Sequence, residues 1–280
     1  INNYRDAQVS IAQYEKLMSI KKEVLPIEAK TVGKIEKLEF KNVFFKYGES
    51  ESAALEDVSF KIAKGQTIAF VGPSGSGKTS LVKLLVSLYK PREGDILYND
   101  ISVNDINLNT IRSQFGFVTQ DTQLFAGTIK ENLKFVNPNA SDEECLEVLY
   151  KSAAKSLLDR ASKGMDTTIG EGGIKVSGGE KQRISIARAL LRNPSIIVFD
   201  EATSALDSIT EEEISKTIRD LGKDQDRMTV LIAHRLSTVM HSDCIYVLEK
   251  GKVTETGTHE ELLKQNGLYF AMWRQQIGER

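Results

Sequence analysis

The sequence predicts an α/β fold with a mainly parallel sheet, an antiparallel β subdomain and a helical subdomain. Apolar runs of strand length, such as residues 196–199 and 229–232, alternate with segments of helical periodicity. Residues 35–62 alternate apolar and polar positions, which is typical of an antiparallel sheet with one solvated face. Residues 129–169 have helical periodicity almost throughout. Strands flanked by helices on both sides indicate a sheet that is covered on both faces.

The chain has 280 residues, of which 40% are hydrophobic and 27% are charged, enough for one large or two modest domains. A net charge of −2 gives no global argument for nucleic-acid binding. Cys145 and Cys244 fit no metal or redox spacing and are interpreted as reduced core thiols of a cytosolic environment. No apolar run approaches the roughly 18 residues of a membrane span, so the fragment itself is predicted to be soluble.

Residues 1–25 are predicted to form a helix that Pro26 ends, followed by a linker over residues 27–34. Because the chain begins with Ile1 and not Met, it is interpreted as a fragment. The helix is expected either to pack on its own domain or to be the cytosolic tail of an upstream element.

After the antiparallel segment, Thr67–Val71 is predicted to be a buried strand that leads into a glycine-rich loop and an apolar helix. Residues 91–95 are predicted to form a turn, residues 96–98 a short strand, and residues 115–118 a strand that ends before Gln120.

In the helical region, Ser141-Asp142-Glu143-Glu144 is a capping box that opens a helix. The later part of the chain is predicted to contain helices over 180–191, 209–221 and 260–276, and strands over 196–199, 229–232 and 244–248, with a hairpin turn at Lys250-Gly251.

The loop Gly72-Pro73-Ser74-Gly75-Ser76-Gly77-Lys78-Thr79 has the spacing of a phosphate-binding P-loop and lies between a strand and a helix, as that motif requires. Its glycines allow successive N–H groups to point inward at a helix N-terminus, which forms an anion cradle. Lys78 is expected to reach the β- and γ-phosphates, and Thr79 to offer its hydroxyl to Mg²⁺. A glycine-rich turn that merely caps a helix is the alternative.

Polar residues that suit phosphoryl transfer follow the later strands. Asp200 and Glu201 end the apolar strand, where ligands of open α/β sheets bind. Asp200 suits magnesium, and Glu201 suits the general base that activates water, although both could be helix-capping acids. His234 follows the next strand and is expected to contact the γ-phosphate, with a structural histidine as the alternative. An Asn-Lys-x-Asp guanine motif is absent, which disfavours GTP.

With these motifs in order, residues from about 35 to 275 resemble the nucleotide-binding domain of an ATP-binding cassette (ABC) transporter, a P-loop NTPase fold. The resemblance implies ATP and Mg²⁺ as ligands, Tyr47 as the adenine-stacking residue, and Gln120 as the Q-loop residue that touches magnesium and the water. It identifies residues 72–80 as Walker A and residues 196–200 as Walker B, which the catalytic Glu201 follows. It also identifies Val176-Ser177-Gly178-Gly179-Glu180 as the signature, Ser204-Ala205-Leu206-Asp207 as the D-loop, and His234 as the switch histidine.

In this family two such domains close head to tail, so that the signature of one binds the γ-phosphate held by the other. The resemblance therefore implies a second nucleotide-binding domain as partner, in a homodimer or with a paralogous chain. The implied catalytic residues are Lys78, Gln120, Glu201 and His234, the implied metal ligands are Thr79, Gln120 and Asp200, and the implied nucleotide contacts are Tyr47, Ser74, Gly75, Ser76, Gly77, Lys78, Thr79, Ser80, Ser177, Gly179 and Asp207.

Two segments resemble those of exporters. The first, Leu124 to Ile129 with Glu131 and Asn132, resembles the exporter segment that meets the transmembrane coupling helices. The second, Gly170-Glu171-Gly172-Gly173, resembles the exporter segment before the signature. They imply an ATPase that drives export from the cytoplasmic face of the plasma membrane. Residues 1–31 would be the extension of a missing transmembrane domain plus linker, and residues 32–280 the nucleotide-binding domain, with a helical subdomain over about 125–190.

The chain departs from the family pattern at Val176 and Glu180 in the signature and at Gly172, where exporters usually carry Arg. Ser177 and Glu180 still fit a capping box. The added carboxylate either opposes ATP-driven closure by repelling the γ-phosphate of the partner site or points into solvent.

Three other functions are alternatives to an exporter ATPase. A soluble ABC ATPase of DNA repair type would split its two lobes with a long coiled coil or pair the fold with basic surfaces, and it is disfavoured because the 122 positions from Lys78 to Asp200 contain no heptad array. The ATPase subunit of an importer would come from a full-length chain without upstream membrane spans. A binding module without turnover is disfavoured because every catalytic position is filled. Substrate contacts would lie in the missing membrane domain, so the sequence leaves the cargo open.

Overall fold

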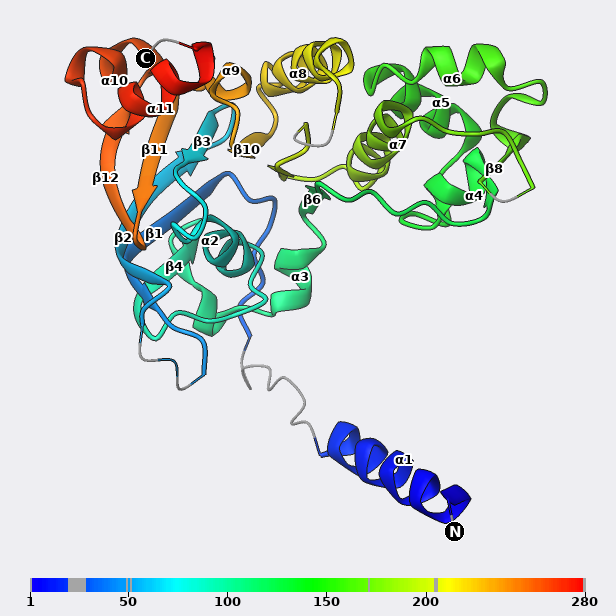
Figure 1. Cartoon of the computed structure of the whole chain (residues 1–280), viewed down its shortest axis with the longest axis horizontal. Coiled ribbons are helices and arrows are strands. Elements are labelled where there is room, and N and C mark those ends of the chain that lie inside the picture. The colour runs from blue at the N-terminus through cyan, green and yellow to red at the C-terminus, as the bar shows by residue number, and fades with distance from the viewer. Residues whose placement is uncertain are drawn as a thin grey trace.

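The computed structural model describes residues 2–19, 29–48, 50, 52–170, 172–203 and 206–278. Its centre is a six-stranded sheet with the order β12-β11-β3-β10-β9-β6, in which all neighbours are parallel except the edge hairpin β11-β12 (Figure 1). A second sheet, β2-β1-β4-β5, is antiparallel. The predicted fold class, mainly parallel with an antiparallel part and a helical part, is confirmed.

The strands are β1 Lys37–Phe45, β2 Leu55–Ala63, β3 Thr67–Val71, β4 Glu93–Tyr98, β5 Ile101–Ser102, β6 Phe115–Val118, β7 Gly127–Thr128, β8 Thr168–Ile169, β9 Ile196–Asp200, β10 Met228–Ile232, β11 Cys244–Glu249 and β12 Lys252–Gly257. The helices are α1 Asn2–Met18, α2 Lys78–Leu85, α3 Leu108–Arg112, α4 Ile129–Lys134, α5 Asp142–Lys151, α6 Lys155–Arg160, α7 Gly178–Leu191, α8 Ser208–Gly222, α9 Leu236–Val239, α10 His259–Gln265 and α11 Leu268–Ile277. Two 3₁₀ turns, Val103–Asp105 and Gly164–Asp166, complete the elements.

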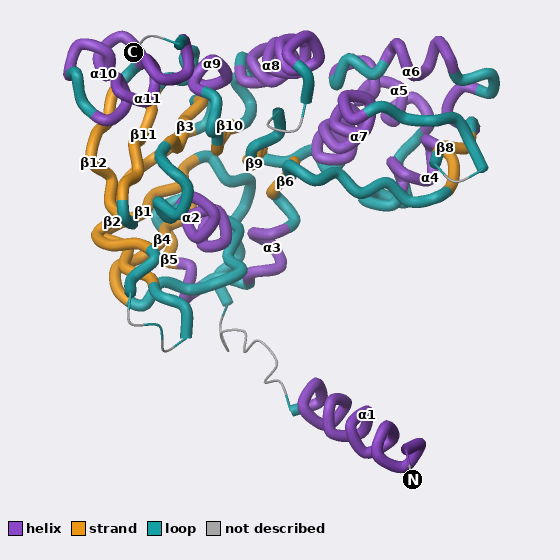
Figure 2. The backbone as a smooth tube through the Cα atoms, in the orientation of Figure 1, coloured by secondary structure: helices purple, strands orange, loops and turns teal. Residues whose placement is uncertain are grey.

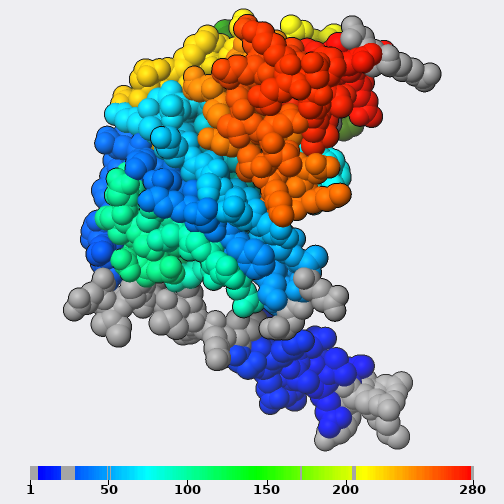
Figure 3. All heavy atoms as spheres, turned by 90° about the vertical axis from the view of Figure 1, so that its left-hand side faces the viewer, coloured from blue at the N-terminus to red at the C-terminus, as the bar shows by residue number. Residues whose placement is uncertain are grey.

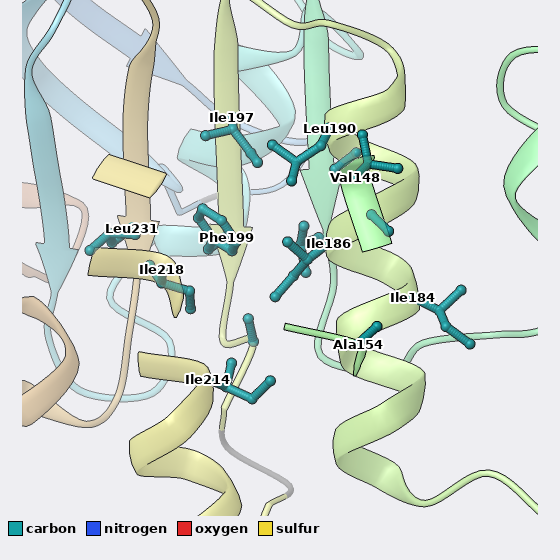
Figure 4. Packing of buried hydrophobic residues seen from close by; sticks show 14 of the residues in the cluster. Val148, Ala154, Ile184, Ile186, Leu190, Ile197, Phe199, Ile214, Ile218 and Leu231 are labelled. Atoms are coloured by element: carbon teal, nitrogen blue, oxygen red, sulfur yellow. The ribbon is translucent and has the colours of Figure 1, made fainter. Parts of the chain in front are cut away.

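The central strands β9 and β10 are mostly apolar and almost entirely buried because both faces of the sheet are covered. Alternate residues of β9 belong to different cores: Ile197 and Phe199 pack with α7 and α8, whereas Ile196 and Val198 pack with α2 and the antiparallel sheet. Figure 4 shows the first of these cores, in which Phe199 lies among side chains of β10, α7 and α8. The P-loop helix is therefore held on one face of the sheet and α7 on the other.

The predicted turn over residues 91–95 is only partly correct, because β4 already begins at Glu93. Gly94 has a φ of +78°, and a Cβ there would lie 2.2 Å from the carbonyl oxygen of Asn42. It faces the irregular register of β1 between Lys41 and Phe44. The glycine thus marks a close backbone approach at a β-bulge and not a chain reversal.

Helices α4 to α7 and the short β7-β8 pair form a helical region that extends from the sheet at β6 (Figure 2). The predicted capping box at Ser141 is present: its hydroxyl accepts from the Glu144 N–H, and the Glu144 carboxylate accepts from the Ser141 N–H. Cys145 is buried in this region and Cys244 is half-buried in β11, and both are free thiols as predicted.

The N-terminal helix α1 ends at Met18, earlier than the predicted Leu25; Leu25 and Pro26 lie outside the described residues. The Ser19 hydroxyl donates to the Lys16 carbonyl oxygen at 2.8 Å, a local bond that competes with further helical turns. Residues 6–19 are exposed, so packing on the domain is not observed (Figure 1). Among the described residues, no helix combines the length and apolar character that crossing a membrane requires.

The C-terminal segment returns to the edge of the central sheet. Strands β11 and β12 form the predicted hairpin, and α10 and α11 follow (Figure 3, orange to red). Helix α10 starts with a capping box of Thr258 and Glu261. This placement sets α11 beside α9, the short helix after the end of β10 (Figure 1).

Candidate active site

The glycine-rich loop between β3 and α2 is shaped by close backbone approaches. Gly77, the N-cap of α2, has a φ of +109°, and a Cβ there would lie 2.6 Å from the Ala54 carbonyl oxygen. A Cβ on Gly72 would lie 2.1 Å from the Leu248 carbonyl oxygen. Only glycine fits either position. No side chain caps the N-terminus of α2, so its first N–H groups remain available to a ligand.

Lys78 is buried beneath this loop, with 5% of its surface exposed. Its Nζ donates to the carbonyl oxygens of Gly72 at 2.9 Å and Pro73 at 3.1 Å. Burial lowers the pKa of Lys78, and the charges of Glu201 and Asp200 oppose that shift. The Oγ of Ser76 is buried without a hydrogen-bond partner. The loop therefore holds an ammonium group and an unpaired hydroxyl that phosphate oxygens could satisfy.

The acidic pair and His234 meet at the carboxyl ends of two neighbouring parallel strands. Strands β9 and β10 pair in register up to Asp200 and Ile232. Glu201 has a φ of +52°, and its N–H donates to the Ile232 carbonyl oxygen at 2.9 Å. This left-handed turn directs the Glu201 carboxylate to within 2.8 Å of the His234 Nε2. Such strain in a residue other than glycine is often found at functional sites.

Asp200 and Glu201 are both half-buried. Burial and the Glu201 charge raise the pKa of Asp200, and Lys78 and His234 oppose this rise. A metal ion bound to Asp200 would further oppose it, because a cation favours the ionised carboxylate.

A hollow of about 720 Å³ opens above the loop. The sequence predicted most of its lining: Ser74, Gly75, Gly77, Lys78, Thr79, Ser80, Glu201 and His234. It missed the segment from Ser52 to Glu56 and the Lys250-Gly251 turn. The Gly251 N–H donates to the Ser76 carbonyl oxygen at 3.0 Å, which joins the hairpin to the P-loop. The only sequence signal for this contact was the hairpin turn itself.

Thr79 and Asp200 both line a neighbouring, larger hollow of about 750 Å³. A hydroxyl and a carboxylate beside a phosphate cradle are oxygen donors of the kind that Mg²⁺ takes together with substrate phosphates. In the described part of the chain, no group of three Asp, Glu, His or Cys side chains is placed to hold a metal ion without additional ligands from a substrate phosphate. The donor set therefore fits a magnesium ion that arrives with a nucleotide.

Gln120, the third predicted metal ligand, is exposed just after β6 and lines a separate hollow with Gly178 and Gln182. It is not among the residues that line the hollow with Lys78. The structure thus brings Thr79 and Asp200 together but leaves Gln120 on the side of α7.

Tyr47 lies next to the P-loop helix and not in the lining of the hollow. Its hydroxyl donates to the Ser80 Oγ at 3.1 Å. Its ring makes edge contacts with Phe45 and Tyr89, at centroid distances of 4.8 and 5.3 Å, and Lys83 Nζ is 5.2 Å from its centroid. Tyr89 and Lys83 were not predicted, and they form with Tyr47 an aromatic and cationic surface beside Ser80.

At the start of α7, Ser177 and Glu180 form the predicted capping box. Glu180 also accepts from Arg160 Nη2 of α6 at 2.6 Å, and 11% of its side chain is exposed. The expectation that Glu180 points into solvent is therefore wrong. Burial raises the pKa of Glu180, but the N–H of Ser177 and the Arg160 guanidinium outweigh burial and hold it below its usual range. The carboxylate is bound within its own chain.

Ser177, Gly179 and Asp207 lie outside the lining of the hollow that contains Lys78. Gly179 is buried, and Asp207 caps α8 by accepting from the Thr210 N–H at 3.1 Å. Hydrogen bonds from Thr210 lower the pKa of Asp207. Of the other predicted segments, Glu171, Ser204 and Ala205 lie outside the described residues.

Residues 55–204 match the family described as ABC transporter. Over 279 residues the chain is 42% identical to the mitochondrial iron-sulfur clusters transporter ATM1 of Candida glabrata, which covers 97% of this chain and 38% of that protein. It is 44% identical over 244 residues to a putative multidrug export ATP-binding/permease protein of Staphylococcus aureus, with 87% of this chain and 41% of that protein covered.

Among solved structures, the fold resembles a bacterial Atm1-family ABC exporter with ATP bound, with a TM-score of 0.85 and 39% sequence identity. The match covers 98% of this chain and 48% of that one. The chain thus spans less than half the length of these relatives.

Proposed function

The chain belongs to the ABC transporter family, and on that premise we propose that it binds and hydrolyses ATP as the nucleotide-binding domain of an ABC exporter. The observation that carries this proposal is the pair of Glu201 and His234, 2.8 Å apart at the edge of the hollow that Lys78 lines. A carboxylate there can accept a proton from an attacking water, and the ammonium group can bind the phosphate under attack.

In this proposal the loop of Gly72 to Ser80 binds the triphosphate. The N-terminal N–H groups of α2 donate to phosphate oxygens, and Lys78 exchanges its bonds to Gly72 and Pro73 for bonds to the β- and γ-phosphates. Tyr47 supplies the surface for adenine. Mg²⁺, when bound through Thr79 and Asp200, would neutralise phosphate charge, and Gln120 would complete the site.

Glu201 is proposed as the general base and His234 as the residue that holds the γ-phosphate. The 2.8 Å contact between them orients the Glu201 carboxylate before substrate arrives. The buried apolar strands β9 and β10 fix both backbones, so little motion is needed to reach the reactive arrangement.

Ser177, Gly179 and Asp207 are proposed to act on a nucleotide held by a second domain. They lie apart from the hollow that contains Lys78, so one chain alone does not complete the site with them. Head-to-tail pairing of two domains would supply each site with a signature segment. The partner is a second copy of this chain or a paralogous one.

Export is proposed from the similarity to exporters and from the exposed surface around residues 124–135. Phe125 and Phe135 are exposed, with ring centroids 4.5 Å apart, and Arg188 lies 5.2 Å from the Phe125 centroid. This surface would receive the coupling helices of a transmembrane domain. Helix α1, exposed along residues 6–18, would extend from that domain.

The test is ATP turnover with Mg²⁺ as a function of protein concentration, for this chain and its Glu201→Gln variant. We expect specific activity to rise with concentration because two chains form each complete site. The variant should bind ATP and lose most turnover. Undiminished turnover in Glu201→Gln would refute the assignment of the base, and activity independent of concentration would refute self-pairing.

A further inference from the structure

The C-terminal helix α11 contacts the loop that carries His234. We propose that Gln276, on the last turn of α11, is a positioning residue that holds the His234 loop in register with Glu201. The inference rests on the proposed function, since it assigns a supporting residue to the same site. Figure 1 places α11 beside α9, which begins two residues after His234.

The Gln276 carboxamide bonds to both sides of one short backbone segment. Its Nε2 donates to the His234 carbonyl oxygen at 2.5 Å, and its Oε1 accepts from the Leu236 N–H at 2.8 Å. Together these bonds fix the backbone from His234 to Leu236, which lies beyond Ile232, the last residue of β10 in its ladders with β3 and β9. A single side chain thus supplies the hydrogen bonds that the sheet no longer provides.

Helix α11 is itself anchored to the sheet edge, so it can serve as a fixed support. The Glu255 carboxylate, on β12, accepts from the N–H groups of Leu268 and Tyr269 at the start of α11. Tyr269 is fully buried, and its hydroxyl lies 2.8 Å from the His259 Nδ1 on α10. The N-terminal half of α11 is therefore held, and Gln276 extends this support to the catalytic loop.

A second contact holds the same loop from the other side. Arg235 pairs with Glu211 on α8, whose side chain is 11% exposed. Leu236 is buried, with 1% of its surface exposed. The backbone around His234 is thus held by α11 on one side and α8 on the other, while the imidazole remains directed at Glu201.

This arrangement predicts that Gln276 acts on turnover and not on nucleotide affinity. The Lys78 loop, which would bind most of the triphosphate, lies between β3 and α2, whereas both Gln276 bonds go to the segment from His234 to Leu236. Loss of the two bonds would let the His234 loop sample other conformations, so that Glu201 and His234 are aligned for less of the time.

The kinetic experiment compares Gln276→Ala and Gln276→Glu with the control Gln275→Ala, because Gln275 is the preceding residue of α11 and is exposed like Gln276. We expect kcat for ATP to fall about three- to tenfold in both Gln276 variants, with KM unchanged. This magnitude is the one expected when an exposed hydrogen bond of modest net strength is lost. Gln276→Glu keeps the size but replaces the donor with a carboxylate that faces the His234 carbonyl oxygen. Gln275→Ala should behave as the parent. In a His234→Ala background, Gln276→Ala should have no further effect.

A second measurement is independent of turnover. The chain has three histidines, so histidine-selective ¹³C,¹⁵N labelling gives NMR ring signals for His234, His241 and His259 only. We expect Gln276→Ala to shift or broaden the His234 signal without changing the other two. If the chain hydrolyses no ATP yet this change occurs, the proposed function fails and the positioning role stands. An unchanged His234 signal overturns the positioning role, even if kcat falls.

Discussion

Helices α2 and α7 both begin with a glycine-containing segment, yet their N-termini are built in opposite ways. At α2, the N-cap Gly77 has a φ of +109° and no side chain satisfies the first N–H groups. At α7, the Ser177 hydroxyl and the Glu180 carboxylate form a complete capping box, and Arg160 neutralises the carboxylate. One terminus is open to an anion, whereas the other already contains one.

This difference indicates how the two termini can meet phosphate. The α2 terminus offers unpaired N–H groups, the buried Lys78 ammonium and the unpaired Ser76 hydroxyl, so it can bind a triphosphate by itself. The α7 terminus has used its capping groups internally and is stable without a ligand. In the proposed dimer it would therefore complete a site that α2 has already loaded, and the order of events would be nucleotide first, pairing second.

The strongest test of the comparison exchanges glycine for alanine at each terminus. A Cβ at Gly77 would lie 2.6 Å from the Ala54 carbonyl oxygen, whereas at Gly178 its nearest neighbour is the Leu206 Cδ2 at 3.6 Å. We expect Gly77→Ala to lower the free energy of unfolding by about 3 kcal/mol, from strain and backbone clash. Gly178→Ala should stay within about 0.5 kcal/mol of the parent. Urea denaturation measures both, and equal values would break the comparison.

The next effect concerns nucleotide affinity. Lys78→Ala should weaken ATP binding about 100-fold, because it removes a charge-assisted bond to phosphate. Lys181→Ala, which removes an exposed cation from the first turn of α7, should leave the affinity of the isolated chain unchanged. Isothermal titration calorimetry at protein concentrations too low for pairing gives the two dissociation constants. A comparable loss in Lys181→Ala would show that α7 contributes to binding within one chain.

A pair of serine variants separates a capped terminus from an open one. Ser177→Ala removes the side-chain acceptor for the Glu180 N–H and should cost about 1 kcal/mol of stability. Ser76→Ala removes a buried hydroxyl that has no partner, so its cost should be near zero or negative. Thermal melting without nucleotide tests this contrast. If Ser76→Ala destabilised the chain as much as Ser177→Ala, the Ser76 hydroxyl could not be unpaired.

The smallest expected effect is electrostatic and concerns Glu180. Since the N–H of Ser177 and the charge of Arg160 outweigh burial and hold its pKa below the usual range, the ionised carboxylate contributes stability above its unfolded pKa. The contribution is lost as the pH falls through the lower, folded pKa. The stability difference between the parent and Glu180→Gln should therefore be constant near neutral pH and shrink below about pH 4. A difference that grew on acidification would contradict this.

The same pair bears on ATP-driven pairing. Because Arg160 neutralises Glu180, we expect Glu180→Gln to change the ATP-dependent dimerisation constant little, and Arg160→Ala to weaken pairing more. Sedimentation at several ATP concentrations compares the three proteins. A clear gain of affinity in Glu180→Gln would instead favour direct repulsion of the γ-phosphate.

The sequence by itself predicted the central strands and most residues that line the candidate site. The apolar runs at β3, β9 and β10 predicted the buried strands, and the spacing of the loop from Gly72 to Thr79 predicted a loop shaped to bind phosphate, because these are local consequences of periodicity and backbone freedom. The carboxyl ends of adjacent parallel strands always meet at one edge, so the proximity of Glu201 and His234 to the loop could be predicted as well.

Only the tertiary structure decided which side chains, distant in the sequence, form ion pairs and hydrogen bonds with the residues of these local motifs. The partner of Glu180 is Arg160 on another helix, and the support of the His234 loop is Gln276 on the C-terminal helix. Gly94 was predicted to be in a turn because the sequence does not show that its strand crosses the bulge at Asn42. Such contacts depend on how the layers pack, and side chains that meet across layers leave no periodic pattern along the chain.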